Sequence, residues 1–221
     1  MKASDVFSAE LQQYKTVILA NGEFPSNEIV RGDLEDSGVV PSCCGEEMEL
    51  LAAGTSDGAV EKLLHFGKQP DVVIGDFDSI PHTLLQQLKG IVIEDKDTEK
   101  NDLQKSLNYC KSNNYNNISI IGACGLREDH QLANLAILDM FSADLDLIMV
   151  SDHGIFSFIS EDRDFNSYPG QAVSIFNLDG KARFTFHGLR YPVHKRQFTH
   201  LWEGSLNISE GELFQIEVYG G

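Results

Sequence analysis

The stretch NDLQKSLNYCKSNNYNNISIIGACGLREDHQLANLAILDMFSADLDLIMVS, residues 101–151, decides the fold class. Apolar residues recur at helical spacing in 103–110 and again in 132–140. Each helical pattern is followed by a short apolar run, at 117–122 and at 145–151. Helix then strand, repeated, is typical of a mostly parallel sheet with helices packed on its faces. The stretch therefore predicts an α/β domain.

Short apolar runs of the same kind continue toward the N-terminus. Four of them read as buried strands, at 16–21, 48–54, 71–75 and 90–94. The segment 32–47 has no clear period and is expected to be a loop or a short insertion. We therefore expect an α/β domain over residues 1–152, with a Rossmann-like sheet and helices on both of its faces.

After residue 151 no long helical pattern remains. Clusters of Gly, Pro, Asn and Asp divide short runs rich in Val, Ile, Phe and Tyr, which suit pleated, half-buried strands. These runs begin at Ile155, Ala172, Ala182, Ser205 and Glu212. A second, smaller, all-β domain with a sandwich-like fold is therefore expected over residues 153–221.

Composition and charge exclude several classes of protein. The chain of 221 residues has 17 Lys and Arg against 34 Asp and Glu, a net charge of -17. That field repels nucleic acid and suits a cationic small molecule or a divalent metal, although an acidic surface in many proteins serves only solubility. There is no signal-peptide core and no run of about 20 apolar residues, so we expect a cytoplasmic protein with no membrane partner. The four cysteines, which include the adjacent Cys43 and Cys44, have the spacing of neither a disulfide framework nor a zinc site.

Acidic residues and glycines follow the predicted strands. In an open parallel sheet, ligands bind beyond the carboxyl ends of the strands. The sequence places there Asp57, the GDFDS motif at 75–79, the acidic run 95–102 and GACGLREDH at 122–130. Clustered carboxylates repel one another, and a hard cation such as Mg²⁺ relieves that repulsion and bridges to substrate phosphates. Taken singly, each of these aspartates also suits a turn or a helix cap.

Two of these segments carry the most specific signals. In GDFDS, Asp76 and Asp78 lie at i and i+2, so on extended backbone they face one side and can share a metal. Arg127 lies between a Gly-rich turn and a predicted helix start, where backbone N–H groups attract phosphate and a guanidinium adds a two-point grip. No GxxxxGKS/T or GxGxxG motif occurs, so neither a P-loop nor a dinucleotide fingerprint accounts for this site.

Together these motifs resemble the thiamine pyrophosphokinase family. The matching segments are Asn21-Gly22, DGAVEKLLHFGKQPDVVIGDFDSI at 57–80, NDLQKSL at 101–107, GACGLREDHQLANLAIL at 122–138, GLRYPV at 188–193 and SLNISEG at 205–211. The resemblance covers nearly the whole chain. The chain has Leu126, Asn101 and Glu210 where the family commonly has Gly, Thr and Asn.

The resemblance implies an enzyme that transfers the pyrophosphate of ATP to the hydroxyl of thiamine, giving thiamine diphosphate and AMP. It implies a homodimer with its active site at the subunit interface. It also implies catalytic roles for Asp76, Asp78, Asp102, Arg127 and Asp129, with Mg²⁺ held by Asp76, Asp78 and Asp102. The ATP and substrate pocket would be lined by Asn21, Asp57, Asn101, Arg127 and His130, and thiamine would contact Ser209 and Trp202.

The charges of the substrates agree with this resemblance. Thiamine has a fixed positive charge and two aromatic rings, which favour an acidic cleft with a stacking surface. Candidate stacking residues are Trp202, Phe198, Tyr191 and Phe186, each of which also suits the core of a sheet. ATP is anionic, so Mg²⁺ and Arg127, together with Lys100, would offset the acidic lining.

Two other functions stay open on the sequence alone. One is a Mg²⁺-dependent nucleotide transferase whose acceptor is not thiamine. The other is a non-enzymatic acidic module that binds Ca²⁺ or a partner protein.

Overall fold

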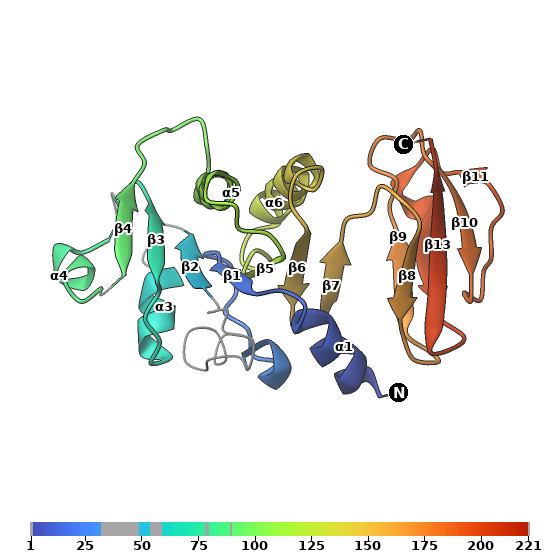
Figure 1. The fold of residues 1–221 in the computed structure, drawn as a ribbon, viewed down its shortest axis with the longest axis horizontal. Helices are drawn as coiled ribbons and strands as arrows, with labels where there is room; N and C mark the ends of the chain where they lie inside the picture. Colours follow the sequence, from blue (N-terminus) through green and yellow to red (C-terminus); the bar gives the residue numbers. More distant parts are fainter. Residues whose placement is uncertain (1, 32–48, 54–58, 78–79, 89, 221) are drawn as a thin grey trace. The chain divides into compact units, whose positions relative to one another are not determined.

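The computed structural model describes residues 2–31, 49–53, 59–77, 80–88 and 90–220 (Figure 1). The chain forms two compact units. One consists of residues 11–158, and the other joins residues 1–10 to residues 159–221. The segment 32–47, for which the sequence predicts a loop or insertion, lies outside the described residues.

A seven-stranded sheet forms the centre of the first unit. Its strands, in spatial order, are β4 (Ile91–Glu94), β3 (Val72–Gly75), β2 (Glu49–Ala53), β1 (Thr16–Leu19), β5 (Ile118–Ile121), β6 (Leu147–Ser151) and β7 (Gly154–Ser157). All neighbouring pairs are parallel except β6 and β7. The six predicted strands of the first domain are confirmed, each within two residues of its expected ends. A parallel-rich α/β sheet is therefore present as predicted.

Strand β7 differs from the prediction. The sequence places the run that begins at Ile155 in the all-β domain, but it pairs with β6 in the first sheet, with Val150 opposite Ile155 and Met149 opposite Phe156. Only Asp152 and His153 connect the two strands. A connection this short can make a hairpin but not a parallel crossover, so β7 must run antiparallel to β6.

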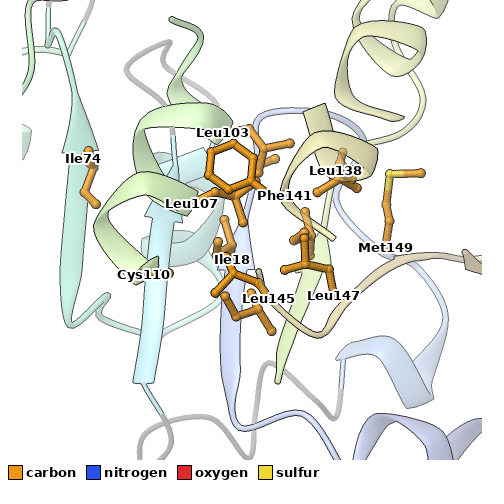
Figure 2. Close-up of a cluster of buried hydrophobic side chains, with 14 of the residues drawn as sticks. Ile18, Ile74, Leu103, Leu107, Cys110, Leu138, Phe141, Leu145, Leu147 and Met149 are labelled. Atoms are coloured by element: carbon orange, nitrogen blue, oxygen red, sulfur yellow. The ribbon is translucent and has the colours of Figure 1, made fainter. Parts of the chain in front are cut away.

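Helices cover both faces of this sheet. The α-helices with described bounds are α1 (Ala3–Leu11), α3 (Ala59–His65), α4 (His82–Leu85), α5 (Asp102–Ser112) and α6 (Glu128–Phe141), and residues 28–31 are also helical. Helices α5 and α6 confirm the two helical patterns. Ile74 of β3 lies in one cluster with Leu107 of α5 and Phe141 of α6 (Figure 2). The adjacent Val73 points to the other face, where it packs with Val60 of α3.

The larger of these clusters positions the helices that begin at the carboxyl edge of the sheet. Ile18, Leu107 and Leu138 are among its most buried members (Figure 2). Each side chain of this size contributes about 1.5–3 kcal/mol when it is fully buried. This packing holds α5 and α6 on the sheet, so that their first turns stay at the edge where strands β4 and β5 end.

The C-terminal part of the second unit is all-β, as predicted. One antiparallel sheet has the order β11 (Arg196–Gln197), β10 (Arg183–His187), β13 (Leu213–Tyr219) and β8 (Arg163–Asn166), and β12 (Gly204–Ile208) pairs with β9 (Ala172–Ile175). Ile175 of β9 lies in the same buried cluster as Phe184 of β10 and Phe214 of β13. The core of this unit therefore takes side chains from both groups of strands.

Helix α1 belongs to the second unit, although it begins the chain. The sequence pattern does not predict a helix over these nine residues, and a helix of this length is not stable alone in water. Packing supplies the stability: Val6 is buried, and Nη2 of Arg163 lies 3.3 Å from Oε1 of Glu10. The contact joins residues 153 positions apart, so no local pattern indicates it.

Asp152, in the turn between β6 and β7, holds the segment that follows β1. Its carboxylate accepts the backbone N–H groups of Ser26 and Asn27 at 2.9–3.0 Å and also the hydroxyl of Ser26. Burial raises the pKa of Asp152, but the hydrogen bonds from Ser26 and Asn27 together outweigh that effect and lower it.

Asp152→Asn is expected to lower the free energy of unfolding by about 1–2 kcal/mol at pH 7, because an amide loses the charge-assisted bonds. The folded-state pKa is depressed, so the stabilisation is present above the unfolded-state pKa and is lost as the pH falls through the folded-state value. Urea unfolding at pH 7 and in acid measures both effects. The control is Asp139→Asn, at an exposed position of α6. If wild type and Asp152→Asn differed in their free energy of unfolding by as much in acid as at pH 7, the stabilising role of the Asp152 carboxylate would be contradicted.

Candidate active site

The order of the strands changes direction at β1. From β1 the sheet continues through β2, β3 and β4 on one side and through β5, β6 and β7 on the other. Ligands of open parallel sheets bind at such a switch point, beyond the carboxyl ends of the strands. The loops after β1 and β5 are therefore the expected centre of a site.

These two loops are joined backbone to backbone. The N–H of Gly22 donates to the carbonyl of Gly122, and the N–H of Glu23 donates to the carbonyl of Cys124 at 2.8 Å. A Cβ atom on Gly22 would lie 2.3 Å from the first carbonyl oxygen and 2.4 Å from the second, so only glycine fits. Lys62 of α3 donates from Nζ to the carbonyl of Gly22 at 2.9 Å. A cation therefore lies beside the layer that the two loops form, which also includes the half-buried Asn21.

Asn101 links three elements at this edge. Its Oδ1 caps α5 by accepting the N–H of Gln104 at 2.8 Å. Its Nδ2 donates to Oδ1 of Asn134 at 3.3 Å, and Asn134 donates in turn to the carbonyl of Ala123 at 3.0 Å. The start of α5, the first half of α6 and the loop after β5 are thus held in one chain of hydrogen bonds.

Aspartates follow β3 and β4 and begin α5. Asp76 directly follows β3, and the N–H of Asp95 donates to the carbonyl of Gly75 at 2.8 Å, so both lie at the carboxyl edge of the sheet. Asp102 is the first residue of α5, and its Oδ1 lies 3.3 Å from Nζ of the buried Lys105. The structure therefore places two of the three predicted metal ligands, Asp76 and Asp102, at this edge.

Arg127 and Asp129 form a two-point ion pair at the start of α6. Nε lies 3.0 Å from Oδ1, and Nη2 lies 2.5 Å from Oδ2. The bond to Arg127 lowers the pKa of Asp129 to about 2, and the same bond raises the pKa of Arg127. Both side chains and the neighbouring His130 are exposed, at a helix start where Arg127 makes no side-chain capping bond. The pair can present its guanidinium to an anion there.

The predicted thiamine-contacting residues have different environments in the second unit. Ser209 is fully buried, and its hydroxyl bonds to Oγ of Ser167 at 2.8 Å and to the carbonyl of Gly211 at 3.1 Å. Trp202 is 71% exposed, with the ring of His200 centred 5.9 Å away.

Among the other stacking candidates, Phe186 and Phe198 belong to the core, whereas Tyr191 is exposed. Tyr191 lines a half-open cavity of about 420 Å³, together with Arg196, Glu203 and Leu206. Phe186 and Phe198 also line this cavity, so of the four aromatic candidates only Trp202 lies outside its lining.

The donor set at the edge of the sheet suits Mg²⁺ in its chemistry. Asp57 and Asp78, like Cys43 and Cys44, lie outside the described residues. Within the described ranges, no three His, Cys, Asp or Glu side chains converge on a metal position. Mg²⁺ commonly takes one or two protein carboxylates and completes its shell with water and phosphate oxygens. Asp76 and Asp102 are donors of that kind.

Sequence reasoning missed three polar residues of this site, Lys62, Lys105 and Asn134. One signal was available, because Lys105 follows Asp102 at i+3, a spacing at which opposite charges on a helix meet.

In the described part of the chain, no helix has the length and apolar character to cross a membrane.

A parallel sheet with carboxylates and an arginine at its carboxyl edge suits the binding of a metal ion and of phosphate groups. Comparison with known proteins identifies the family. Residues 52–149 match the family model described as thiamin pyrophosphokinase, catalytic domain, and residues 154–221 match the model of its substrate-binding domain. The chain belongs to the thiamin pyrophosphokinase family, which confirms the resemblance and makes it a thiamine diphosphokinase.

Solved structures agree with this assignment at the level of the fold. The chain is similar to thiamine pyrophosphokinase from Bacillus subtilis, with a TM-score of 0.71, 18% identity and coverage of 94% of this chain and 95% of that one. For yeast thiamin pyrophosphokinase the TM-score is 0.70 at 13% identity, and the match covers 99% of this chain and 90% of the yeast chain. For the Candida albicans enzyme it is 0.63 at 16% identity, covering 95% and 87%. The search among curated protein sequences gave no match.

Proposed function

We propose that this protein transfers the pyrophosphate group of ATP to the hydroxyl of thiamine, with Mg²⁺ as its metal, and releases thiamine diphosphate and AMP. The observation that carries the proposal is the match of consecutive parts of the chain to both the catalytic and the substrate-binding model of one family. The net charge of -17 supports it, since thiamine is a cation.

The residues at the sheet edge have different roles in the proposed reaction. Mg²⁺, when bound, would be held by Asp76, Asp78 and Asp102 and would supply positive charge to the transferring phosphates. Arg127 and the N–H groups at the start of α6 would donate to phosphate oxygens, while Asp129 keeps the guanidinium oriented before substrate arrives. Transfer of this type requires mainly positioning and charge stabilisation.

The remaining assignments complete the proposal. Asn21, Asp57, Asn101 and His130 would line the ATP pocket. Trp202 would stack on thiamine with its exposed indole, and Ser209 would act through the turn at Gly211 that its hydroxyl holds. The ATP-binding part would be the Rossmann-like region of residues 1–152, and the thiamine-binding part the sandwich of residues 153–221.

We also propose a cytoplasmic homodimer with the active site at the subunit interface. The exposed apolar side chains of the second unit support an interface, because Leu206 is 82% exposed and Leu201 is 54% exposed. Sedimentation at micromolar concentration tests the dimer, and a fully active monomer would contradict it.

An assay of products tests the proposed reaction. Purified protein is incubated with ATP, MgCl₂ and thiamine, and chromatography measures AMP and thiamine diphosphate, which are expected in equal amounts. Pyridoxine and other alcohols replace thiamine in parallel reactions. ADP with thiamine monophosphate would contradict pyrophosphate transfer, and turnover only with another alcohol would favour the transferase with a different acceptor. Absence of ATP binding in calorimetry would favour the non-enzymatic module.

Arg127→Lys is expected to lower kcat/KM by more than about tenfold, or about 1.4 kcal/mol, because lysine keeps the charge but cannot grip two oxygens at once. The pair with Asp129 is exposed and contributes little to stability, so the melting temperature should hardly change. Steady-state kinetics measure the effect, with Arg183→Lys on an exposed position of β10 as the control. Unchanged kinetics would leave Arg127 as an ordinary helix-start residue.

A further inference from the structure

Lys105 is a buried cation on α5, the helix that packs on β2 and β3. Its side chain is 2% exposed. Lysine is almost never fully buried without a partner, and taking an ammonium group out of water costs several kcal/mol. Leucine or methionine would pack at this position without that cost, so the charge has a use other than packing.

The partner of Lys105 is Asp102, one turn earlier on α5. Nζ lies 3.3 Å from Oδ1, and the carboxylate is 26% exposed, so the acid reaches the surface and the base lies beneath it. Lys111 of the same helix forms a second ion pair, with Asp144 after the end of α6, and both partners are about half exposed. The two pairs differ in burial, which makes the exposed pair a matched control.

Two further observations concern the surroundings of Lys105. Ser106 is next to Lys105 and at i+4 from Asp102, and within the described residues its buried hydroxyl has no hydrogen-bond partner. The pKa of Asp97 is lowered first by its hydrogen bond to Lys100 and, to a smaller extent, by the charge of Lys105. A buried polar layer therefore lies under the carboxylates at the start of α5.

We propose that Lys105 is a positioning residue of the pyrophosphate-transfer site, whose buried ammonium fixes the carboxylate of Asp102 and offsets part of the negative charge around it. The inference rests on the proposed function, because it assigns Lys105 an effect on transfer that passes through Asp102. If Lys105 were needed only for packing, its substitution would lower kcat/KM by the same factor whether position 102 carries a carboxylate or an amide.

A double-mutant cycle separates these two roles. The four chains are wild type, Lys105→Met, Asp102→Asn and the double variant, since methionine has similar length and no charge. Lys105→Met is expected to lower kcat/KM at least about tenfold in the presence of Asp102, and less than about twofold in the Asp102→Asn background. Lys105→Arg, which keeps the charge, should lower kcat/KM less than Lys105→Met does. Lys111→Met should stay within about twofold of wild type.

The same cycle is measured without turnover, by calorimetric titration of each chain with a non-hydrolysable ATP analogue and Mg²⁺. Lys105→Met is expected to weaken binding at least about threefold, and again only in the presence of Asp102. If wild type makes no thiamine diphosphate but the binding cycle shows this coupling, the proposed function fails and the positioning role stands.

Two results would overturn the positioning role. One is an equal loss from Lys105→Met in the wild-type and the Asp102→Asn backgrounds. The other is a Lys105→Met chain within about twofold of wild type in both kcat/KM and affinity. Circular dichroism verifies the fold of each chain beforehand, and Lys105→Gln, which also removes the charge, replaces the methionine variant in the cycle if that chain does not fold.

Discussion

Asp102→Asn is expected to lower kcat at least about 100-fold, which corresponds to about 2.7 kcal/mol of transition-state stabilisation. The substitution keeps the shape of the side chain and removes the charge that, as proposed, holds the metal and orients the phosphates. Stability should suffer much less, because the amide oxygen can still accept from Nζ of Lys105 and the group is 26% exposed. A large loss of kcat with only a modest change in melting temperature is therefore the result expected for a catalytic role of Asp102.

Initial rates of thiamine diphosphate formation measure this loss, and thermal melting measures the stability. The control is Asp144→Asn, which removes the acid of the exposed pair with Lys111 on the same helix and should leave the rate unchanged. A rate for Asp102→Asn within about threefold of wild type would remove Asp102 from the catalytic set.

Gly22→Ala is expected to cause the largest loss of stability, about 3 kcal/mol or more. The new Cβ would lie 2.3 Å from one carbonyl oxygen and 2.4 Å from another, and both belong to backbone that cannot rotate away. The loops after β1 and β5 must then separate, with loss of the hydrogen bonds from Gly22 and Glu23. A loss of this size lowers the melting temperature of a chain this long by roughly 6–12 °C.

Urea unfolding and thermal melting measure the effect of Gly22→Ala. The matched control is Gly154→Ala in β7, where an added Cβ meets nothing within 4 Å and the backbone is not in the left-handed region. That control is expected to be neutral or slightly stabilising, because alanine restricts the unfolded chain. Equal melting temperatures for the two variants would mean that the loops do not form the layer described above.

The parallel strands and the two long helices could be predicted because their signals are local. A strand buried on both faces is a continuous apolar run, and a helix on the sheet repeats its apolar residues every three or four positions. Which strand pairs with which other strand is not shown by any local sequence pattern. The run at Ile155 looks the same in either sheet, and only the two-residue turn before it decides that it pairs with β6.

The site shows the same division between residue type and contact. Asp76, Asp102 and Arg127 could be placed at the sheet edge because they follow strands or begin helices in the sequence. Their partners depend on side-chain conformation and packing, so the two-point bond from Arg127 to Asp129 was not predicted. Lys105 is a further case, since a lysine in a helical pattern reads as exposed until α5 is seen to pack on β2 and β3.

Membership of α1 in the second unit has a consequence for synthesis of the protein on the ribosome. The first ten residues are made first, whereas the other residues of their unit, 159–221, are made last. At about 5–20 residues per second, the intervening 148 residues take roughly 7–30 s to translate. During that interval the strands of its own unit have not been made, and nine residues do not keep a helix alone. Folding of this unit can finish only after the last strand, β13, has left the ribosome.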